Sequence, residues 1–363
     1  MSVNQTISST KNGVYTTLKP PEIDFVPIIL EQKDRNTSAK PFEMSGVMSC
    51  GKGVDLVWGA SGSKEVFLME TKGQLRKIFE ADNRHGFGLA VFDGQYAWLP
   101  VTGPESRVLA INPMTDEIVQ FTSEDGLPVF QFVALASIGV GRLCLSAGFG
   151  KQTDRRAFIA VLELSNPRGK EIRIIHEATQ QLMPNTPPSI QHLDPRISYV
   201  PKFMISSLDE TEQSWMVVLG RIMPGSSLYN PSLLIKPDTA SVEVIDPHVE
   251  TDIAPQNVAF KEHAAYWNNG MGLRCLRTDS KNSEVVRVLP GEGRVMFYNG
   301  RLHVVGIDWW IVDEGENPFR KLSVKMPSRR VYSFQFFVSS HYGLVFRAED
   351  SLYKNYQVVF LNE

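Results

Sequence analysis

Short apolar runs separated by turn residues follow one another along almost the whole chain. The runs are rich in Val, Ile, Phe, Leu and Tyr, and Gly, Asn, Asp and Pro stand between them. Apolar positions spaced three and four residues apart, which would indicate amphipathic helices, are nearly absent. The pattern therefore predicts many short β-strands joined by turns.

The clearest group of strands lies between residues 88 and 122. Apolar runs at 89–92, 96–101, 107–111 and 118–122 predict four strands. Asp93-Gly94 separates the first two runs, and glycine there can adopt the positive φ of a hairpin turn. We therefore expect a four-stranded antiparallel unit in this region.

Similar groups recur before and after this one. They occupy residues 44–80, 132–177, 199–246, 257–289, 294–324 and 332–361, and the group at 257–289 is the least regular. Self-similar four-stranded units at a spacing of about 40 to 50 residues are typical of β-propeller blades. The sequence therefore predicts an all-β fold, a single closed β-propeller of about seven four-stranded blades.

The last group contains only three apolar runs, so a closed ring needs a fourth strand from elsewhere. An open ring would expose unpaired sheet edges, which promote aggregation. Residues 25–30 are the better candidate for this strand and residues 13–18 the second. Pro27 is tolerated there because an outermost strand does not need every backbone donor. We accordingly divide the chain into an N-terminal extension, 1–24, and a propeller domain, 25–363.

Composition and charge indicate a globular protein without a nucleic-acid footprint. Of 363 residues, 42% are hydrophobic, and 37 Lys and Arg stand against 40 Asp and Glu, a net charge of -3. This balance predicts neither nucleic-acid binding nor attraction to an anionic membrane. No apolar run approaches the roughly 20 residues of a membrane span.

Cysteine usage and the polar N-terminus make the cytoplasm the expected compartment, with secretion or a periplasmic location as alternatives. The three cysteines, Cys50, Cys144 and Cys275, are far apart and have apolar neighbours. This spacing favours neither a disulfide framework nor a Cys-x-x-Cys metal site, and we expect buried free thiols. Residues 1–11 lack the apolar core of a signal peptide.

One segment resembles a known family. Phe121-Thr122-Ser123-Glu124-Asp125-Gly126-Leu127-Pro128 looks like the linker of two-component-regulator propeller repeats, and 133–137 and 141–147 follow it as the next two strands would. Cys144 stands where that family has tryptophan, and Ser146-Ala147 where it has Gly-Thr. The resemblance implies a propeller blade. Family members are often sensor ectodomains, so it leaves a ligand-sensing domain as an alternative function.

The sequence offers little evidence of catalytic chemistry. Its histidines, none within five residues of another, are His85, His176, His192, His248, His263, His303 and His341. The expected inner strands are mostly apolar and provide no matched set of Asp, Glu and His for a metal in the channel. We therefore expect no metal and no cofactor. Trp309 and Trp310 should point to opposite faces of one strand and pack in the core.

The insertions between strands are the most informative features for function. Residues 178–198 are Pro-rich and lie between the third and fourth groups, and residues 221–232 lie within the fourth. Residues 148–156 and 102–106 are expected to be loops at the same end of the third and second blades. Long loops on a rigid scaffold often carry binding residues. The candidate contact residues are Lys151, Arg155, Arg156, His192, Arg196, Arg221 and Tyr229.

These loops predict a noncatalytic binding module that holds a protein or peptide partner on the rim of blades two to four. An alternative is a propeller hydrolase or lyase acting on a carbohydrate or small ester. That enzyme would need acids and histidines from several blades to converge, and only His192, Asp194 and Glu105 are available on the rim. The ligand-sensing domain is the third possibility.

Overall fold

The structure is a computed structural model of the chain. It describes residues 6–10, 13–17, 22–32, 40–59, 64–82, 86–130, 132–151, 154–165, 169–179, 200–208, 214–221, 232–245, 258–261, 264–268, 272–277, 284–287, 293–306, 308–312, 319–324, 327, 335–349 and 353–361. Within these residues the chain is nearly all β, and the helical turns are the 3-10 segments η1 (Ser123–Asp125) and η2 (Pro237–Thr239).

Antiparallel meanders of four strands make up most of the molecule. The first contains β6 (Met44–Ser49), β7 (Asp55–Gly59), β8 (Glu65–Thr71) and β9 (Gln74–Glu80). In the second, β10 (Gly86–Phe87) and β11 (Val91–Phe92) both pair with β12 (Ala97–Thr102), which is followed by β13 (Arg107–Ile111) and β14 (Ile118–Phe121). The inner position of the second sheet is therefore one strand interrupted at residues 88–90.

The next three sheets repeat the same order. The third contains β15 (Phe132–Gly139), β16 (Arg142–Lys151), β17 (Asp154–Ser165) and β18 (Gly169–Thr179). The fourth contains β19 (Val200–Leu208), β20 (Ser214–Arg221), β21 (Ser232–Lys236) and β22 (Ser241–Ile245). The fifth contains β23 (Val258–Lys261), β24 (Ala264–Asn268), β25 (Leu273–Arg277) and β26 (Glu284–Arg287).

The remaining strands form one eight-stranded sheet that includes a strand from the N-terminal region. One half contains β27 (Gly293–Tyr298), β28 (Arg301–Gly306), β29 (Trp309–Val312) and β30 (Phe319–Val324). The other half contains β31 (Gln335–Ser339), β32 (Gly343–Glu349), β33 (Tyr353–Leu361) and β3 (Glu22–Pro27). β3 pairs antiparallel with β33 and parallel with β30, so it joins the two halves.

An N-terminal strand thus completes the C-terminal sheet, as predicted, although it covers 22–27 rather than 25–30 and so begins before the predicted boundary at residue 25. Residues 13–18, the second candidate for this strand, do not join the last sheet. They instead contain β2 (Gly13–Thr17), which pairs with β1 (Thr6–Thr10). Two short strands, β4 (Glu31–Gln32) and β5 (Lys40–Pro41), pair with each other before the first sheet.

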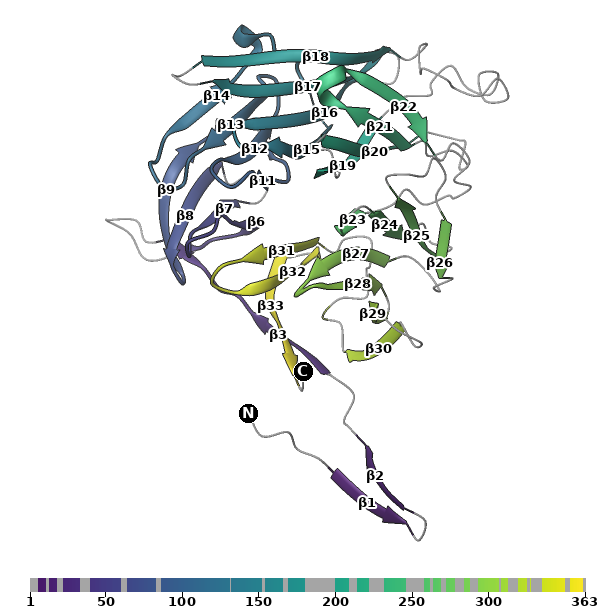
Figure 1. The fold of residues 1–363 in the computed structure, drawn as a ribbon. Helices are drawn as coiled ribbons and strands as arrows, with labels where there is room; N and C mark the ends of the chain where they lie inside the picture. Colours follow the sequence, from purple (N-terminus) through teal and green to yellow (C-terminus); the bar gives the residue numbers. More distant parts are fainter. Residues whose placement is uncertain are drawn as a thin grey trace.

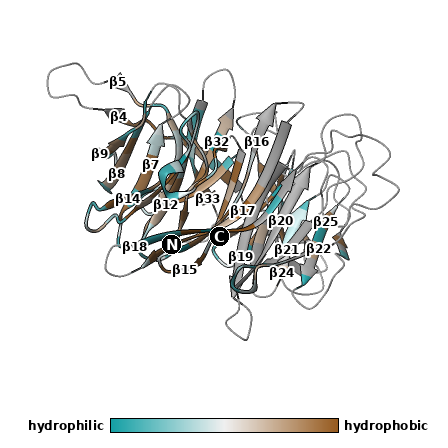
Figure 2. Cartoon of the chain, turned by 90° about the horizontal axis from the view of Figure 1, so that it is seen from above, coloured by the Kyte–Doolittle hydropathy of each residue, from teal (hydrophilic) through white to brown (hydrophobic). Residues whose placement is uncertain are grey.

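Figure 1 shows the first strand of each sheet near the centre of the molecule and the fourth toward the periphery. Successive inner strands contact one another, β6 with β11, β11 with β15, β15 with β19, β19 with β23 and β23 with β27. At the end of the chain, β31 contacts β6. The hydrophobic stretches of the described residues lie mainly in the strands and the hydrophilic ones mainly in the connections (Figure 2).

The core consists of apolar side chains packed between neighbouring sheets. Trp309 is fully buried in the cluster formed with β31–β33, whereas Trp310 packs against the cluster formed with β23–β25. The two tryptophans therefore point to opposite faces of β29, as the strand alternation predicts. Phe336 and Phe337 likewise point to opposite faces of β31. Phe336 packs in the cluster with Trp309, and Phe337 packs in the cluster with residues of the first sheet.

Gly46 is required by the packing of Trp58 in the first sheet. The pairing of β6 with β7 shifts register between Met44 and Gly46, and the indole of Trp58 lies directly over Gly46. A Cβ atom at residue 46 would overlap with that indole. Trp58 in turn makes an edge contact with Phe337 of β31, with ring centroids 6.0 Å apart.

Polar contacts between the first and last sheets, like the contact between Trp58 and Phe337, join residues that are far apart in the sequence. The Asp55 carboxylate is buried and accepts hydrogen bonds from the Ser339 hydroxyl at 2.5 Å and the Ser340 N–H at 2.6 Å. The Arg347 guanidinium donates to the carbonyl oxygen of Ser45 at 2.6 Å, and the Asn355 amide donates to that of Met44 at 3.1 Å. These contacts hold the β31–β33 strands against β6 and β7.

The three thiols are expected to be unreactive in the folded protein. Cys50, Cys144 and Cys275 are free and buried, as predicted, and burial raises the pKa of all three, to about 12 for Cys50. Because the thiolate is the reactive form, a thiol reagent at pH 8 should label less than one thiol per chain under native conditions and all three in urea. Rapid labelling of a native thiol would show that its burial is not maintained in solution.

Candidate functional site

The expected loop at residues 148–156 is instead a β-hairpin. β16 continues to Lys151 and β17 begins at Asp154, and these two residues pair directly. Gly150 pairs with Arg155, and Phe149 pairs with Arg156. The prediction of a loop here is therefore wrong, because pairing on both sides of β17 extends the strands through the two glycines.

The hairpin brings Lys151, Arg155 and Arg156 to the end of the third sheet. Arg221 is the last residue of β20 and pairs with Val200 at the equivalent end of the fourth sheet. The two sheets are neighbours, since β15 and β16 both contact β19. The backbones of four of the predicted binding residues therefore lie at matching ends of adjacent sheets.

The other three predicted binding residues, His192, Arg196 and Tyr229, lie outside the described residues, as does Asp194. The Pro-rich segment predicted as a loop runs from the end of β18 at Thr179 to the start of β19 at Val200. The shorter one runs from Arg221 to Ser232, between β20 and β21. Both segments therefore connect strand ends on the side of the sheets where Lys151 and Arg221 stand.

The second sheet contributes its predicted loop at the same end, between β12 and β13. Ser106 is buried there; its hydroxyl donates to the carbonyl oxygen of Phe130 at 2.7 Å and accepts from the Phe130 N–H at 3.0 Å. This pair of bonds fixes the loop against the segment that leads into β15. Glu105 is exposed beside it, 3.5 Å from the guanidinium of Arg107. We name the region formed by residues 103–106, 148–151, 154–156 and 221 the rim.

The segment that resembles the two-component-regulator linker forms a capped 3-10 turn. The Asp125 carboxylate accepts hydrogen bonds from the Thr122 N–H at 2.9 Å and the Thr122 hydroxyl at 3.1 Å. Gly126 has a φ of 92°, a left-handed conformation that suits glycine. Leu127 is buried next, so the Asp-Gly-Leu sequence turns the chain from β14 toward β15.

Lys170 ties this turn to the outer strand of the third sheet. Its ammonium lies 2.7 Å from the Asp125 carboxylate and also donates to the carbonyl oxygen of Gln120 at 2.9 Å. Burial raises the pKa of Asp125, but the hydrogen bonds from Lys170 and Thr122 outweigh it, and the pKa lies below its usual value. The stabilisation is therefore present above the ordinary aspartate pKa of about 3.9 and is lost as pH falls through the lower folded value.

Lys170→Met should raise the pKa of Asp125, because it removes the largest interaction that favours the carboxylate. The loss of stability at pH 7 should be about 1 kcal/mol or less, since the pair is partly exposed. An NMR titration of the Asp125 carboxyl carbon in both proteins measures the shift directly. An unchanged pKa would mean that the two groups are not paired in solution.

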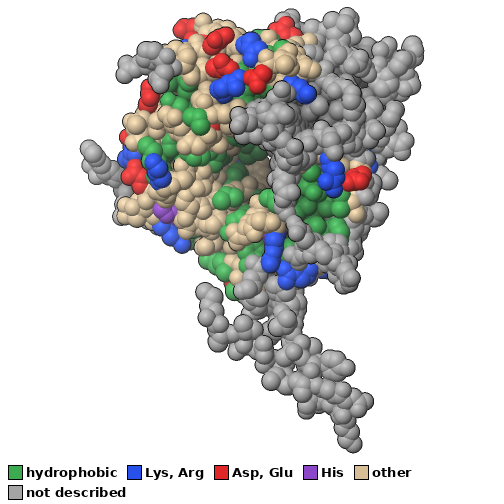
Figure 3. Space-filling model, in the orientation of Figure 1, with side chains coloured by type: hydrophobic (Ala, Val, Ile, Leu, Met, Phe, Trp, Pro, Cys, Tyr) green, Lys and Arg blue, Asp and Glu red, His purple; other side chains and the backbone are tan. Residues whose placement is uncertain are grey.

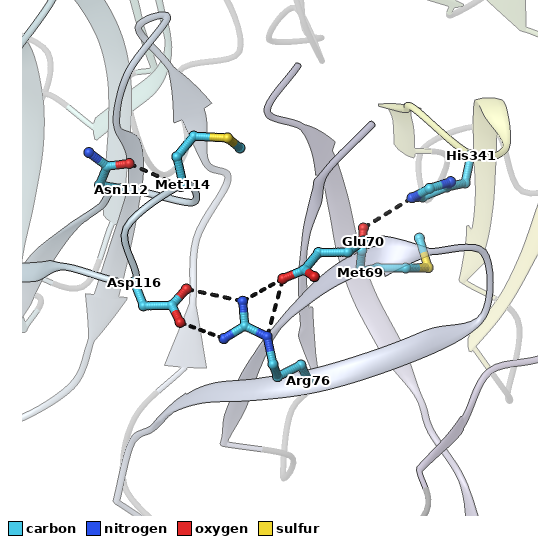
Figure 4. A network of polar contacts seen from close by, with 7 residues as sticks. All are labelled: Met69, Glu70, Arg76, Asn112, Met114, Asp116 and His341. Carbon is cyan, nitrogen blue, oxygen red and sulfur yellow. Dashed lines mark hydrogen bonds and ion pairs between the residues drawn. The ribbon is translucent and has the colours of Figure 1, made fainter. Parts of the chain in front are cut away.

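An exposed ion-pair network links the first two sheets at the ends of their strands that lie away from the rim (Figure 4). The Arg76 guanidinium lies 2.5 Å from Glu70 on the same hairpin and binds both carboxylate oxygens of Asp116, at 2.7 and 3.0 Å. The hydrogen bonds that the guanidinium donates to Asp116 and to Glu70, in that order of size, raise the pKa of Arg76. All three side chains are about half exposed, so the network links neighbouring sheets but contributes little stability.

Asp93 is a structural residue that the sequence analysis treated only as part of a turn. Its carboxylate accepts hydrogen bonds from the backbone N–H of Gln95 and Tyr96 within its own turn. It also accepts from the Trp98 indole at 2.7 Å and from the Gly141 N–H at 2.9 Å. Gly141 belongs to the next sheet, so one aspartate fixes a hairpin and joins two sheets.

Of the residues nominated for the enzyme alternative, Glu105 lies within the described part of the chain, and His192 and Asp194 lie outside it. Glu105 has Arg107 as its neighbour, and no group of three or more His, Cys, Asp or Glu side chains that could hold a metal ion occurs among the described residues. Charges of both signs are interspersed on the face in Figure 3, which is hollowed near its centre with hydrophobic side chains beside the hollow. No helix in the described part of the chain is long and apolar enough to cross a membrane.

Comparison with solved structures places the chain among β-propeller proteins at the level of fold. The extracellular domain of a hybrid two-component system from B. thetaiotaomicron matches with a TM-score of 0.54 and 13% identity over 93% of this chain and 39% of that one. The Dos1 propeller matches with a TM-score of 0.54 and 11% identity over 91% and 83% of the two chains. The WD40 β-propeller domain of Doa1 matches with a TM-score of 0.53 and 10% identity over 93% and 97%.

At these identities the likeness concerns the fold alone. No family model matches the sequence, and no curated protein matches it. The expected resemblance to a propeller is therefore confirmed for the structure, and membership of the two-component-regulator family remains a prediction.

Proposed function

We propose that this chain is a noncatalytic binding module that holds a protein or peptide partner on the rim. The observation that carries the proposal is the placement of Lys151, Arg155, Arg156 and Arg221 at matching ends of two adjacent sheets. The anchored loop at Ser106 supplies a third sheet on the same side. Residues presented at the ends of rigid strands need little reordering to bind, which favours affinity.

The scaffold beneath the rim is, in our proposal, a closed ring of seven blades. The contact of β31 with β6 and the Asp55 and Arg347 hydrogen bonds between the last and first sheets support closure. The pairing of β3 with both β30 and β33 supports a seventh blade completed by the N-terminal strand. A closed ring protects sheet edges and fixes the spacing of the rim residues.

The charge of the rim indicates the chemistry of the partner. The chain has a net charge of -3, whereas the rim contains three arginines and one lysine against two acids, Glu105 and Asp154, which gives it a formal charge of +2. Arginine suits bidentate binding of carboxylates. We therefore expect the partner to present an acidic segment, and we expect its association to weaken as salt concentration rises.

Replacing residues 180–196 with a short Gly/Ser linker tests whether the longest connection on this side contributes to the site. We expect the variant to keep its thermal unfolding temperature within a few degrees, because long surface connections add little to stability. We expect it to lose its partner in affinity capture from the host organism, followed by mass spectrometry. An unchanged partner profile together with an unchanged unfolding temperature would remove this segment from the proposed site.

A further inference from the structure

His303 is a buried histidine that belongs to no proposed binding surface. It lies on β28, is 2% exposed, and accepts a hydrogen bond at Nδ1 from the Trp309 indole N–H at 3.0 Å. An indole nitrogen can only donate, so Nδ1 carries no proton. The proton is therefore on Nε2, which donates to the carbonyl oxygen of Tyr298 at 3.3 Å. The ring is held as one neutral tautomer.

The surroundings of His303 disfavour a positive charge. The ring centroids of Tyr298, Trp309 and Phe360 lie 6.4, 6.0 and 5.7 Å from the imidazole. Its direct neighbours across β27 and β29 are Met296 and Ile311, both apolar. Phe360 belongs to β33, so His303 lies where the β27–β30 half of the eight-stranded sheet packs against the β31–β33 half.

Strand alternation identifies the charged and titratable groups on the faces that meet there. On the described residues of β3 and β27–β33, these groups are Arg294, Tyr298, Arg301, Arg320, Lys354 and Tyr356. Glu22, Asp24 and Glu349 stand on the opposite faces of their strands. The described charged and titratable groups on the side of His303 are therefore arginines, a lysine and two phenols.

We infer that His303 is an acid-sensitive latch between the two halves of the eight-stranded sheet. A proton on Nδ1 would face the Trp309 N–H across 3.0 Å, which replaces a hydrogen bond with two opposed donors. It would also place a charge at a buried position among aromatic rings. Protonation therefore weakens the packing of β33, and of β3 paired with it, against β28 and β29.

The sign of the effect follows from proton uptake. An unfolded histidine titrates near pH 6.5 and takes up a proton that the latched ring does not. Below that pH, the unfolding equilibrium constant contributed by His303 rises up to tenfold per pH unit, or about thirtyfold between pH 7.5 and pH 5. The latch is therefore closed at neutral pH and opens in acid.

His303→Asn tests the latch, because its amide oxygen can accept the Trp309 N–H near the former Nδ1 position and does not titrate. Urea unfolding at pH 7.5 and pH 5.0 should show that acid destabilises the wild type about thirtyfold more than this variant. His341→Asn is the matched control, since His341 is only partly buried and lies on the β31–β32 turn. It should keep the wild-type pH dependence. Equal pH dependence in wild type and His303→Asn would overturn the inference.

A second measurement on the wild type decides the question even if the variant does not fold. Ring nitrogen NMR shifts should report His303 as neutral, with its proton on Nε2, in the folded protein at pH 5.5. A folded protein with His303 doubly protonated and unchanged amide protection in β28, β29 and β33 would contradict the latch.

Discussion

Deleting residues 1–31 is expected to abolish cooperative unfolding of the protein. β3 pairs with β33 along its whole length and with β30 at Glu22 and Ile23, so its removal exposes two strand edges at once. It also removes Phe25, whose ring packs against those of Phe346, Tyr356 and Trp309 at 5.2, 6.3 and 6.4 Å. We expect a broad thermal transition, aggregation, or both.

Deleting residues 1–21 is the matched control, because it removes β1 and β2 but keeps β3. β1 and β2 pair only with each other among the described strands. This shorter deletion should unfold cooperatively within a few degrees of the full chain. A protein that lacks residues 1–31 and melts as sharply as the control would refute the role of β3 in completing the last sheet.

Asp55→Ala is expected to destabilise the protein by roughly 3 to 5 kcal/mol, because it removes two charge-assisted hydrogen bonds to a fully buried carboxylate. The loss of hydrogen bonding should also affect residues that do not contact Asp55 directly. The Ser339 hydroxyl that donates to Asp55 also accepts the N–H groups of His341 and Tyr342, so the whole β31–β32 turn loses its support. Urea unfolding at pH 7 measures the difference.

Ser49→Ala provides the comparison for this variant at the same junction. Among the described residues, Ser49 shares one exposed hydrogen bond, 2.6 Å to the Ser340 hydroxyl, with the last sheet. Its loss should cost less than about 1 kcal/mol. If Asp55→Ala were no more destabilising than Ser49→Ala, the first and last sheets would not be held together in the way described.

Local sequence features predicted the individual sheets well. Alternating apolar runs and turns such as Asp93-Gly94 depend on neighbouring residues, and the four-stranded meanders occur where those patterns recur. The N-terminal strand was also predictable, because the last group lacked a fourth apolar run and β-sheets avoid open edges.

The contacts between sheets were not predictable in the same way. Asp55 and Ser339 are 284 residues apart, and Asp93 and Gly141 are 48 apart, so no local pattern connects them. The glycines at 148 and 150 led to the prediction of a loop, whereas pairing with β17 holds them in a strand. Three of the seven predicted binding residues lie outside the described residues, and their part in the rim stays a prediction.

Affinity capture with a charge-neutralised rim tests the proposed function most directly. Lys151, Arg155, Arg156 and Arg221 would each be replaced by glutamine, and the control would replace the exposed Lys52, Lys236, Arg277 and Lys354 in the same way. Both proteins lose the same charge, so a general electrostatic effect cancels. We predict a stoichiometric protein partner that the wild type and the control retain and the rim variant loses at least tenfold. Equal capture by all three proteins, or no partner for the wild type, would contradict the binding module proposed here.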